Sequence, residues 1–295
     1  MSTDTADASD GETATVGITG EPTGGIRMWL NQTWAFTART ISSLRHNPAL
    51  VLTAVGFPPM FYFVFTLSDT GSDVLAATAI SWGMFGALFA CLYVFGNQLA
   101  TDVEDQRYVT FRSMPIYPSA EFAGRMLAGL LVAVAAMLAG IAAGLVDGAS
   151  FTLRGPSSLV VVPLAFTLVC LLFMLIAMPI VLLLEDESYV EYVTSIVAVF
   201  LFVVTGSNGI SPNAAFIDVG VMDTSWLNYL PNSLATRLLA YHLVPADQWT
   251  VAGITPPSMP EGFVFLGIVG LYGLLAVALG VLFVRTMMYK LEVKP

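Results

Sequence analysis

Long apolar runs separated by short polar stretches dominate this chain. The six longest runs cover residues 49–67, 74–100, 126–146, 158–184, 192–208 and 262–284. Each run is long enough to cross about 30 Å of hydrocarbon as an α-helix. A transmembrane β-barrel would alternate apolar and polar positions instead. The pattern therefore predicts an all-α integral membrane protein with six transmembrane helices.

Residues 26–45, before the first run, are predicted to form an amphipathic helix. Its apolar and basic residues fall near helical spacing: Ile26, Leu30, Trp34, Ile41 and Leu44, with Arg27, Arg39 and Arg45. Such a helix buries its apolar face at the membrane surface while its arginines reach lipid phosphates. We therefore expect an interfacial helix ahead of the first span.

Two further features shape the expected bundle. Pro58 and Pro59 interrupt the backbone hydrogen bonding of the first span and should bend or break its helix. The third and sixth spans carry glycines, which allow helices to approach closely in lipid: Gly124, Gly129, Gly140, Gly144, Gly267, Gly270, Gly273 and Gly280.

Composition agrees with a membrane protein. Hydrophobic residues make up 56% of the 295 residues and charged residues only 11%, with a mean hydropathy of +0.78. Soluble domains have roughly 25% charged residues. These values exclude a soluble enzyme and a nucleic-acid-binding protein.

The net charge is −10, and half of it lies in residues 1–25. This segment contains five acids, no base and few large apolar residues, so we expect a disordered acidic tail ahead of a membrane domain over 26–295. Lysine occurs only at Lys290 and Lys294. An acidic chain poor in lysine leads to the hypothesis of a salt-adapted, halophilic protein.

The basic residues predict the orientation. With six spans both termini share a side, and nine of the 11 Lys and Arg residues fall on it, leaving Arg154 and Arg237 on the other. Because Lys and Arg concentrate on the cytoplasmic side, we expect a multi-pass protein of the cell membrane with both termini in the cytoplasm. Residues 209–261 then form an outer segment. Within it, Trp226 to Val244 should contain a short helix beginning at Pro231 that lies on, or dips into, the outer leaflet.

Few residues offer catalytic or metal chemistry. The chain has no GxxxxGK[ST] phosphate-binding loop, so we expect no ATP hydrolysis by the chain itself and no catalytic residue. His46 and His242 fall on opposite sides of the membrane; His46 is interpreted as an interfacial residue before Asn47-Pro48, and His242 as a surface residue of the outer helix. Cys91 and Cys170 lie in apolar runs and are interpreted as small hydrophobic packing residues, so no metal site is expected.

Two acidic clusters keep an alternative open. Carboxylates bind Mg²⁺, and a membrane-embedded lipid-modifying enzyme could use such a site. The clusters are Asp102, Glu104 and Asp105, and Glu185, Asp186, Glu187 and Glu191. Neither repeats an Asp motif on one helical face, and no ionisable residue lies well inside a predicted span. We therefore interpret both clusters as solvated helix edges.

The most informative stretch is QLATDVEDQRYVTFRSMPIYPSAEFAGRMLAGL, residues 98–130, between spans two and three. It resembles the cytoplasmic segment of type-2 ATP-binding-cassette (ABC) transporter permeases, especially their drug- and lipid-exporter branch. The shared order is charged residues at 104–107, then Met114-Pro115, then Gly124-Arg125. The amphipathic helix, the proline-bearing first span and the outer stretch WLNYLPNSLATRLLAYHL extend the resemblance over 26–290. The chain departs from the family at Val109-Thr110, where Gly-Thr is usual, and at Leu230-Pro231.

The resemblance implies a function and two kinds of protein partner. Two permease copies, in a homodimer or close heterodimer, would surround a path through the membrane lipid. Separate ATPase subunits would supply ATP and Mg²⁺ and dock on the cytoplasmic coupling segment, residues 102–118. The residues implied in this docking are Glu104, Arg107, Tyr108, Phe111, Arg112, Met114, Pro115 and Tyr117. A permease is the favoured interpretation; the lipid-modifying enzyme and an assembly factor without transport are the alternatives.

Overall fold

The computed structural model describes residues 25–66, 74–112, 114–184, 186–210, 224–246, 248 and 263–283. The structure is 89% helical, and no strand occurs among the described residues. Six helices are long and apolar enough to cross a membrane, which confirms the all-α fold class: Pro48–Thr66, Leu75–Glu104, Pro118–Val146, Ser158–Leu184, Glu187–Val204 and Val264–Leu282. The acidic tail 1–24 and most of the outer segment lie outside the described residues.

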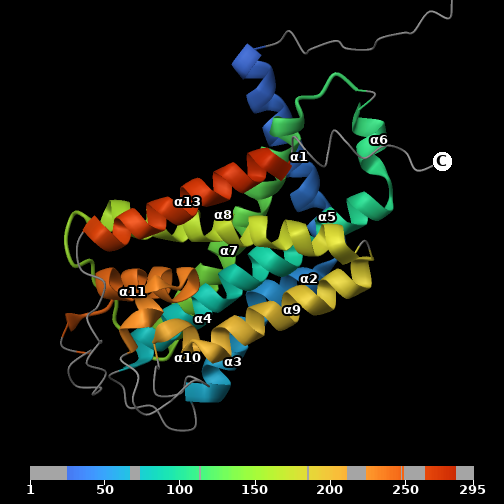
Figure 1. The fold of residues 1–295 in the computed structure, drawn as a ribbon. Coiled ribbons are helices and arrows are strands. Elements are labelled where there is room, and N and C mark those ends of the chain that lie inside the picture. Colours follow the sequence, from blue (N-terminus) through green and yellow to red (C-terminus); the bar gives the residue numbers. More distant parts are fainter. Residues whose placement is uncertain are drawn as a thin grey trace, which may run out of the picture.

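Two of the spans are made of several helical elements, and shorter helices lie between the spans (Figure 1). Helix α1 (Gly25–His46) precedes the first span, which consists of α2 (Pro48–Val51), the π turn η1 (Leu52–Gly56) and α3 (Phe57–Thr66). The second span consists of α4 (Leu75–Phe89), the π turn η3 (Ala90–Val94) and α5 (Phe95–Glu104). The remaining elements are α6 (Arg107–Arg112), α7 (Pro118–Val146), α8 (Ser158–Leu184), α9 (Glu187–Val204), α10 (Gly206–Gly209), η5 (Thr224–Tyr229), α11 (Pro231–Leu243) and α13 (Phe263–Phe283).

The proline pair alters the first span as expected, through a π turn. Neither Pro58 nor Pro59 can donate a backbone hydrogen bond to the preceding turn. The helix widens into η1 over Leu52–Gly56, immediately before these prolines, and then continues as α3. Pro58 is buried, and its ring lies against Gly86 of α4. Pro58 therefore packs against α4 in addition to disturbing the helical hydrogen bonds of the first span.

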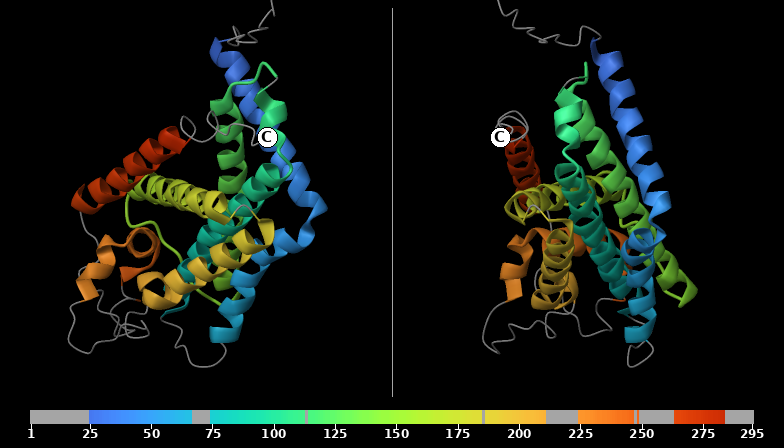
Figure 2. Two further views of the ribbon diagram at one scale, coloured as in Figure 1. Left: turned by 45° about the vertical axis from the view of Figure 1, so that its right-hand side comes forward. Right: turned by 90° about the vertical axis from the view of Figure 1, so that its right-hand side faces the viewer.

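The second span is the central helix of the fold. In its most apolar stretch 89% of residues are buried, compared with 22% in α9 and in α13. Figure 2 shows α1, α3 and α7 on one side of this helix and α8, α9, α11 and α13 on the other. All residues of α4 except Thr78 are buried. The second span therefore holds two layers of helices together.

Glycines bring α4 and α7 into close contact. A Cβ atom added at Gly140 would lie 2.5 Å from Cα and 2.7 Å from N of Gly83, and 3.0 Å from the carbonyl oxygen of Ala79. These are backbone atoms, which cannot move aside as a flexible side chain can. The expectation of glycine-mediated packing is confirmed for α7, where Gly124 makes a similar approach to α1.

Helix α1 packs part of its surface against the protein and leaves another part exposed. Thr33, Thr37 and Leu44 are buried, and the Thr37 hydroxyl lies 3.0 Å from the carbonyl oxygen of Gly124 in α7. On the half nearer the N-terminus, Ile26, Leu30 and Trp34 are exposed. Figure 2 shows α1 running beside α7. The predicted amphipathic helix is thus present and anchored along α7, and it leaves an apolar patch free near its beginning.

Helix α11 is buried within the helix bundle. Every residue from Asn232 to Ala240 is buried, and the helix packs against α8, α4, α10 and α13. The sequence left open whether this helix lies on the membrane surface or dips into the bilayer. Its burial among other helices favours the second position. The interpretation of His242 as a surface residue is wrong, because its side chain is buried and its Nδ1 lies 2.9 Å from the Ser158 hydroxyl.

We predict that Gly140→Ala destabilises the fold while Gly267→Ala does not. At Gly140 the added methyl group meets the backbone of α4, and such overpacking costs about 1–3 kcal/mol. Gly267 lies in α13 with open space around it, so the same substitution is tolerated there. Thermal unfolding of the purified protein in detergent measures both. Equal midpoints for the two variants would contradict the close α4–α7 packing.

Candidate functional site

Charged side chains gather where α5 ends and α7 begins. Asp102 of α5 and Glu121 and Arg125 of α7 are buried, each with no more than 7% of its surface exposed. A buried charge is costly unless an opposite charge and hydrogen bonds compensate it. We call this group, together with Arg107 of α6, the charged junction.

Arg125 is the centre of the charged junction. Its Nη2 lies 2.6 Å from Oδ2 of Asp102, and its Nε lies 3.1 Å from Oε1 of Glu121, which also accepts from Nη2. Its Nη1 donates to the carbonyl oxygen of Gln98 at 3.2 Å. Arg125 therefore joins the last turns of span two to the first turns of span three. Charge-assisted hydrogen bonds of this kind are the strong ones.

Asp102 also binds the helix that follows it. Its Oδ1 lies 2.7 Å from Nη1 of Arg107 and 3.9 Å from Nη2 of Arg39 on α1. Nη2 of Arg107 in turn lies 2.8 Å from Oδ2 of Asp105. One buried carboxylate thus faces three guanidinium groups from three different helices. Its position fixes α1, α6 and α7 relative to α5.

A tight turn between α5 and α6 makes this geometry possible. Gln106 has φ of +53°, a left-handed conformation that costs a residue with a Cβ roughly 1–2 kcal/mol. The amide N–H groups of Asp105 and Gln106 donate to the carbonyls of Thr101 and Val103 at 2.9 and 3.1 Å. The chain therefore reverses within two residues and returns Arg107 to Asp102.

Helix α1 holds the far end of the coupling segment. The Gln32 amide accepts from the backbone N–H of Tyr117 at 2.9 Å and donates to the carbonyl oxygen of Pro115 at 3.2 Å. The indole N–H of Trp29 donates to the Ser119 hydroxyl at 3.0 Å. We call these contacts the α1 bracket. They attach the extended stretch before α7 to a helix that lies about 85 residues earlier in the chain.

An aromatic contact completes the attachment of α6. The Phe111 ring meets the Phe36 ring edge-on, with 5.7 Å between centroids, and the Arg39 guanidinium lies 5.3 Å from the Phe111 centroid. Aromatic and cation–π pairs each contribute about 0.5–1.5 kcal/mol beyond burial. Phe111 therefore faces α1 and is half-buried there.

The predicted coupling residues differ in how far their side chains are exposed. Glu104, Met114 and Pro115 are exposed, whereas Arg107, Phe111 and Tyr117 are partly buried by contacts within the chain. The side chains of Tyr108 and Arg112 lie outside the described residues. The predicted short helix is present as α6.

Sequence reasoning missed the buried part of the charged junction. The expectation that no ionisable residue lies well inside a span was wrong for Glu121 and Arg125, because α7 begins at Pro118 and not near residue 126. The i,i+4 spacing of these two residues was a usable signal, since opposite charges at that spacing pair on a helix. The partnership with Asp102 has no such local signal.

The two acidic clusters are explained in different ways. In the first cluster, Asp102 is buried and paired with arginines, so it does not lie on a solvated helix edge. Glu104 and Asp105 are exposed. In the second cluster, Asp186 caps α9 by accepting from the Ser188 N–H at 2.8 Å, and Glu191 accepts from the Tyr93 hydroxyl at 2.5 Å. Within the described ranges, no three His, Cys, Asp or Glu side chains lie close enough together to hold a metal ion.

The other end of the bundle carries an uncharged polar network around α10. Gly206, Ser207, Asn208 and Gly209 all have positive φ. The Asn208 amide oxygen accepts from Asn232 at 3.0 Å, and the Ser207 carbonyl accepts from the Ser81 hydroxyl at 2.7 Å. These bonds from α4 and α11 hold a left-handed turn that would be unfavourable alone.

Arg237 of α11 supports the same turn. Its Nε donates to the Gly209 carbonyl oxygen at 2.9 Å and its Nη1 to the Asn228 amide oxygen at 2.6 Å. Burial lowers the pKa of Arg237 to about 10, so the side chain still carries its charge at neutral pH. The buried guanidinium is thus satisfied by amide and carbonyl oxygens, and it fixes α11 to the end of α9.

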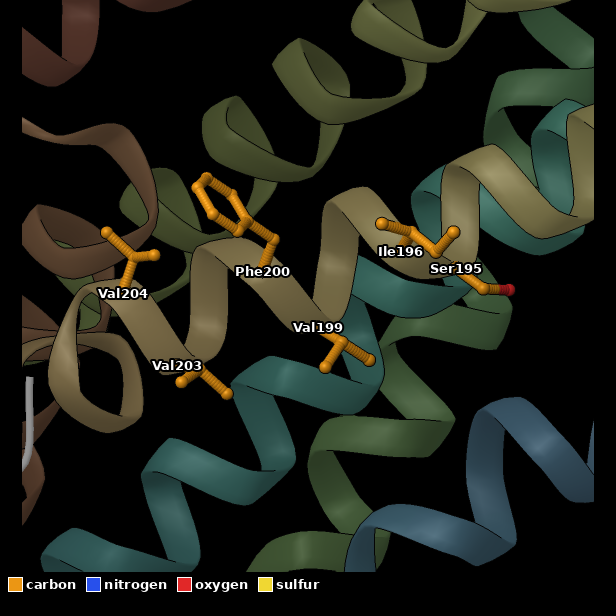
Figure 3. A pocket seen from close by; sticks show the side chains of 6 residues that line it. All are labelled: Ser195, Ile196, Val199, Phe200, Val203 and Val204. Carbon is orange, nitrogen blue, oxygen red and sulfur yellow. The ribbon is translucent and has the colours of Figure 1, made fainter. Parts of the chain in front are cut away.

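Helix α9 presents an apolar surface with a shallow hollow of about 510 Å³ (Figure 3). The hollow is lined by Ser195, Ile196, Val199, Phe200, Val203 and Val204. Exposed residues on this surface also recur at alternating spacings of three and four: Tyr189, Tyr192, Ile196, Val199 and Val203. That spacing is typical of a helix that pairs with another helix.

Comparisons of the chain with models of known protein families, with curated proteins and with solved structures gave no match. The geometry of the site and the resemblance stated above are therefore the grounds for a functional proposal.

We predict that Asp102→Asn lowers the free energy of unfolding by about 3 kcal/mol. Removing one member of a buried ion pair costs about 3–5 kcal/mol, and Glu121 still compensates Arg125 in this variant. Asp105→Asn, which removes an exposed partner of Arg107, should cost less than about 1 kcal/mol. Thermal unfolding in detergent compares them. Similar losses in the two variants would show that the charged junction is not the stabilising element.

Proposed function

We propose that the chain is the membrane-spanning permease subunit of an ATP-driven transporter of the type-2 ABC class. The observation that carries the proposal is the geometry of the coupling segment. A short helix and an extended stretch between spans two and three are joined to α1, α5 and α7 by the charged junction and the α1 bracket. This arrangement suits a segment that receives force from another subunit.

The mechanical argument starts from rigidity. A segment that moved independently of the spans could not transmit the motion of a partner to the transport path. Here Arg107 pairs with α5, Phe111 packs on α1, and the Gln32 amide binds the backbone on both sides of Ile116. A displacement of α6 would therefore displace the ends of three helices together. The central position of the second span would distribute this motion to both layers.

The contact with the partner would be made by the exposed members of the segment. Met114 has 47% of its surface exposed, and Glu104 and Pro115 lie exposed on the same segment. Apolar side chains exposed next to charged ones are typical of the centre and rim of an interface. We assign Phe111 and Tyr117 a positioning role, because the Phe111 ring packs on α1 and the Tyr117 backbone is bound by Gln32 of α1 and by the first turn of α7.

A second copy of the permease fits the surface of α9. Its exposed residues alternate at spacings of three and four, and the adjacent hollow could receive a side chain from another helix. By contrast, the exposed residues of α13 are aliphatic and suit contact with lipid. We propose a dimer, in a homodimer or a close heterodimer, in which α9 contributes to the contact between copies.

The remaining assignments follow from the charge distribution and the resemblance. Both termini and the coupling segment would lie in the cytoplasm of a cell with this protein in its cell membrane, and transport would be outward. ATP and Mg²⁺ would bind the separate ATPase subunit. The alternative of a metal-dependent lipid-modifying enzyme receives no support from Asp102, whose oxygens are engaged by arginines.

We predict that the chain, purified in mild detergent from its natural host, carries an ATPase subunit containing a phosphate-binding loop. Its mass should correspond to two permease copies with two ATPase subunits. Met114→Ala should weaken ATPase binding about tenfold, the expected effect of truncating an interface anchor.

The matched control is Leu183→Ala, because Leu183 is 83% exposed and lies at the end of α8 on the same predicted side. This variant should bind the ATPase as the unmodified chain does. A chain that purifies with no ATPase, or equal ATPase binding by the two variants, would contradict the proposal.

A further inference from the structure

A small polar cleft lies between α1, α5 and α6, next to the charged junction. Its volume is about 120 Å³. It is lined by three arginines, one carboxylate and several uncharged polar side chains: Arg39, Arg107, Arg125, Asp102, Thr40, Ser43, Gln98 and Thr101, together with Phe36. The side chains of Arg39 and Arg107 are each 43% exposed, so the cleft opens to the surface.

Several hydrogen-bond donors of the cleft have no partner within the described part of the chain. The buried Nε2 of Gln98 has none. The Arg39 guanidinium stands 3.9 Å from Asp102 and stacks on Phe111 without donating a hydrogen bond there. The Gln98 Nε2 has almost no accessible surface, whereas the Arg39 side chain is exposed, so Arg39 is the donor that an acceptor in the cleft can reach.

The charges that line the cleft favour an anion. Three guanidinium groups face one carboxylate, which leaves two positive charges in excess on the lining. Glu121 and Asp105 do not line the cleft, but they pair with Arg125 and Arg107, so three carboxylates balance the three guanidinium groups. Arg39 differs from the other two arginines because its nearest carboxylate oxygen, on Asp102, lies 3.9 Å away, beyond hydrogen-bond distance. An anion in the cleft would therefore lie beside the Arg39 guanidinium and the Ser43 hydroxyl, with Asp102 as the one carboxylate among the lining residues.

The size and chemistry of the cleft select the ligand. A volume of about 120 Å³ accommodates a phosphate group but no larger head group in full. Guanidinium donors recognise phosphate oxygens in particular, and basic pockets between helices on the cytoplasmic side of a membrane are a recurring site for lipid phosphates. The cleft also adjoins α1, whose Ile26, Leu30 and Trp34 form an exposed apolar patch.

We propose that this cleft binds a phosphate group, supplied either by an anionic lipid or by a free phosphate ion. A bound phosphate would link Arg39 of α1 to Arg107 of α6, whose guanidinium groups both face Asp102 of α5. Binding would therefore strengthen the attachment of the coupling segment to α1. This proposal is independent of the transporter assignment.

The test uses the full-length protein, purified in detergent and supplied with phosphatidylglycerol, phosphatidylcholine or inorganic phosphate. Native mass spectrometry measures bound lipid, and thermal unfolding measures stabilisation by each probe. Two variants alter the cleft: Arg39→Gln removes a donor, and Ser43→Asp places a negative charge inside it. Two matched controls on the same helix, Arg45→Gln and Ser42→Asp, alter exposed residues that do not line the cleft.

We expect the two cleft variants to bind phosphatidylglycerol or inorganic phosphate, the probes with net negative charge, about tenfold more weakly than the unmodified protein, because each variant loses or opposes a charge-assisted hydrogen bond. Both controls should bind these probes normally. Binding of phosphatidylglycerol alone identifies a lipid source, and stabilisation by inorganic phosphate as well identifies the free ion as sufficient.

Three results would overturn the proposal. These are equal binding by cleft and control variants, equal binding of phosphatidylglycerol and phosphatidylcholine without an effect of inorganic phosphate, and no effect of any probe. If Arg39→Gln fails to fold, the comparison of Ser43→Asp with Ser42→Asp decides the matter alone.

Discussion

The pairing of Arg125 with Asp102 and Glu121 is the interaction on which the cytoplasmic end of the predicted topology depends. These three charges lie near the ends of two membrane-spanning helices, at positions with almost no contact with solvent. Left unpaired, any of them would cost several kcal/mol. Their mutual satisfaction fixes the relative height of α5 and α7, and this in turn determines where the segment between those helices can lie. The turn at Gln106 and the contacts of Gln32 then hold this segment at both of its ends.

Buried polar groups are compensated in different ways at the two ends of the second span. At one end, Asp102 gathers arginines from three helices. At the other, Ser81, Asn208, Asn232 and the single charged residue Arg237 hold a left-handed turn through amide, hydroxyl and carbonyl partners. Between them the second span is packed closely against α7 through glycines. A helix that is held by specific polar contacts at both ends can transmit a displacement from one side of a membrane to the other.

The sequence predicted the features that depend on local pattern. Six apolar runs gave the six spans, Pro58 and Pro59 marked the irregular first span, and the short helix between spans two and three was expected. Features set by contacts between distant residues were not predictable in the same way. Gln32 binds backbone atoms more than 80 residues away, and His242 lies on a helix whose burial depends on α8 and α4. The start of α7 was placed eight residues late because Glu121 and Arg125 read as a polar boundary, although their pairing allows the helix to continue through them.

The central claim is that the charged junction and the coupling segment face the cytoplasm, where ATP is available to a partner. Single cysteines at Met114 and at Leu153 test it most directly, because both side chains are exposed and both native cysteines are buried. In intact cells a membrane-impermeant thiol reagent should modify Leu153→Cys, which lies in the loop between α7 and α8. It should modify Met114→Cys only after the membrane is permeabilised. Labelling of Met114→Cys from outside intact cells would contradict the account.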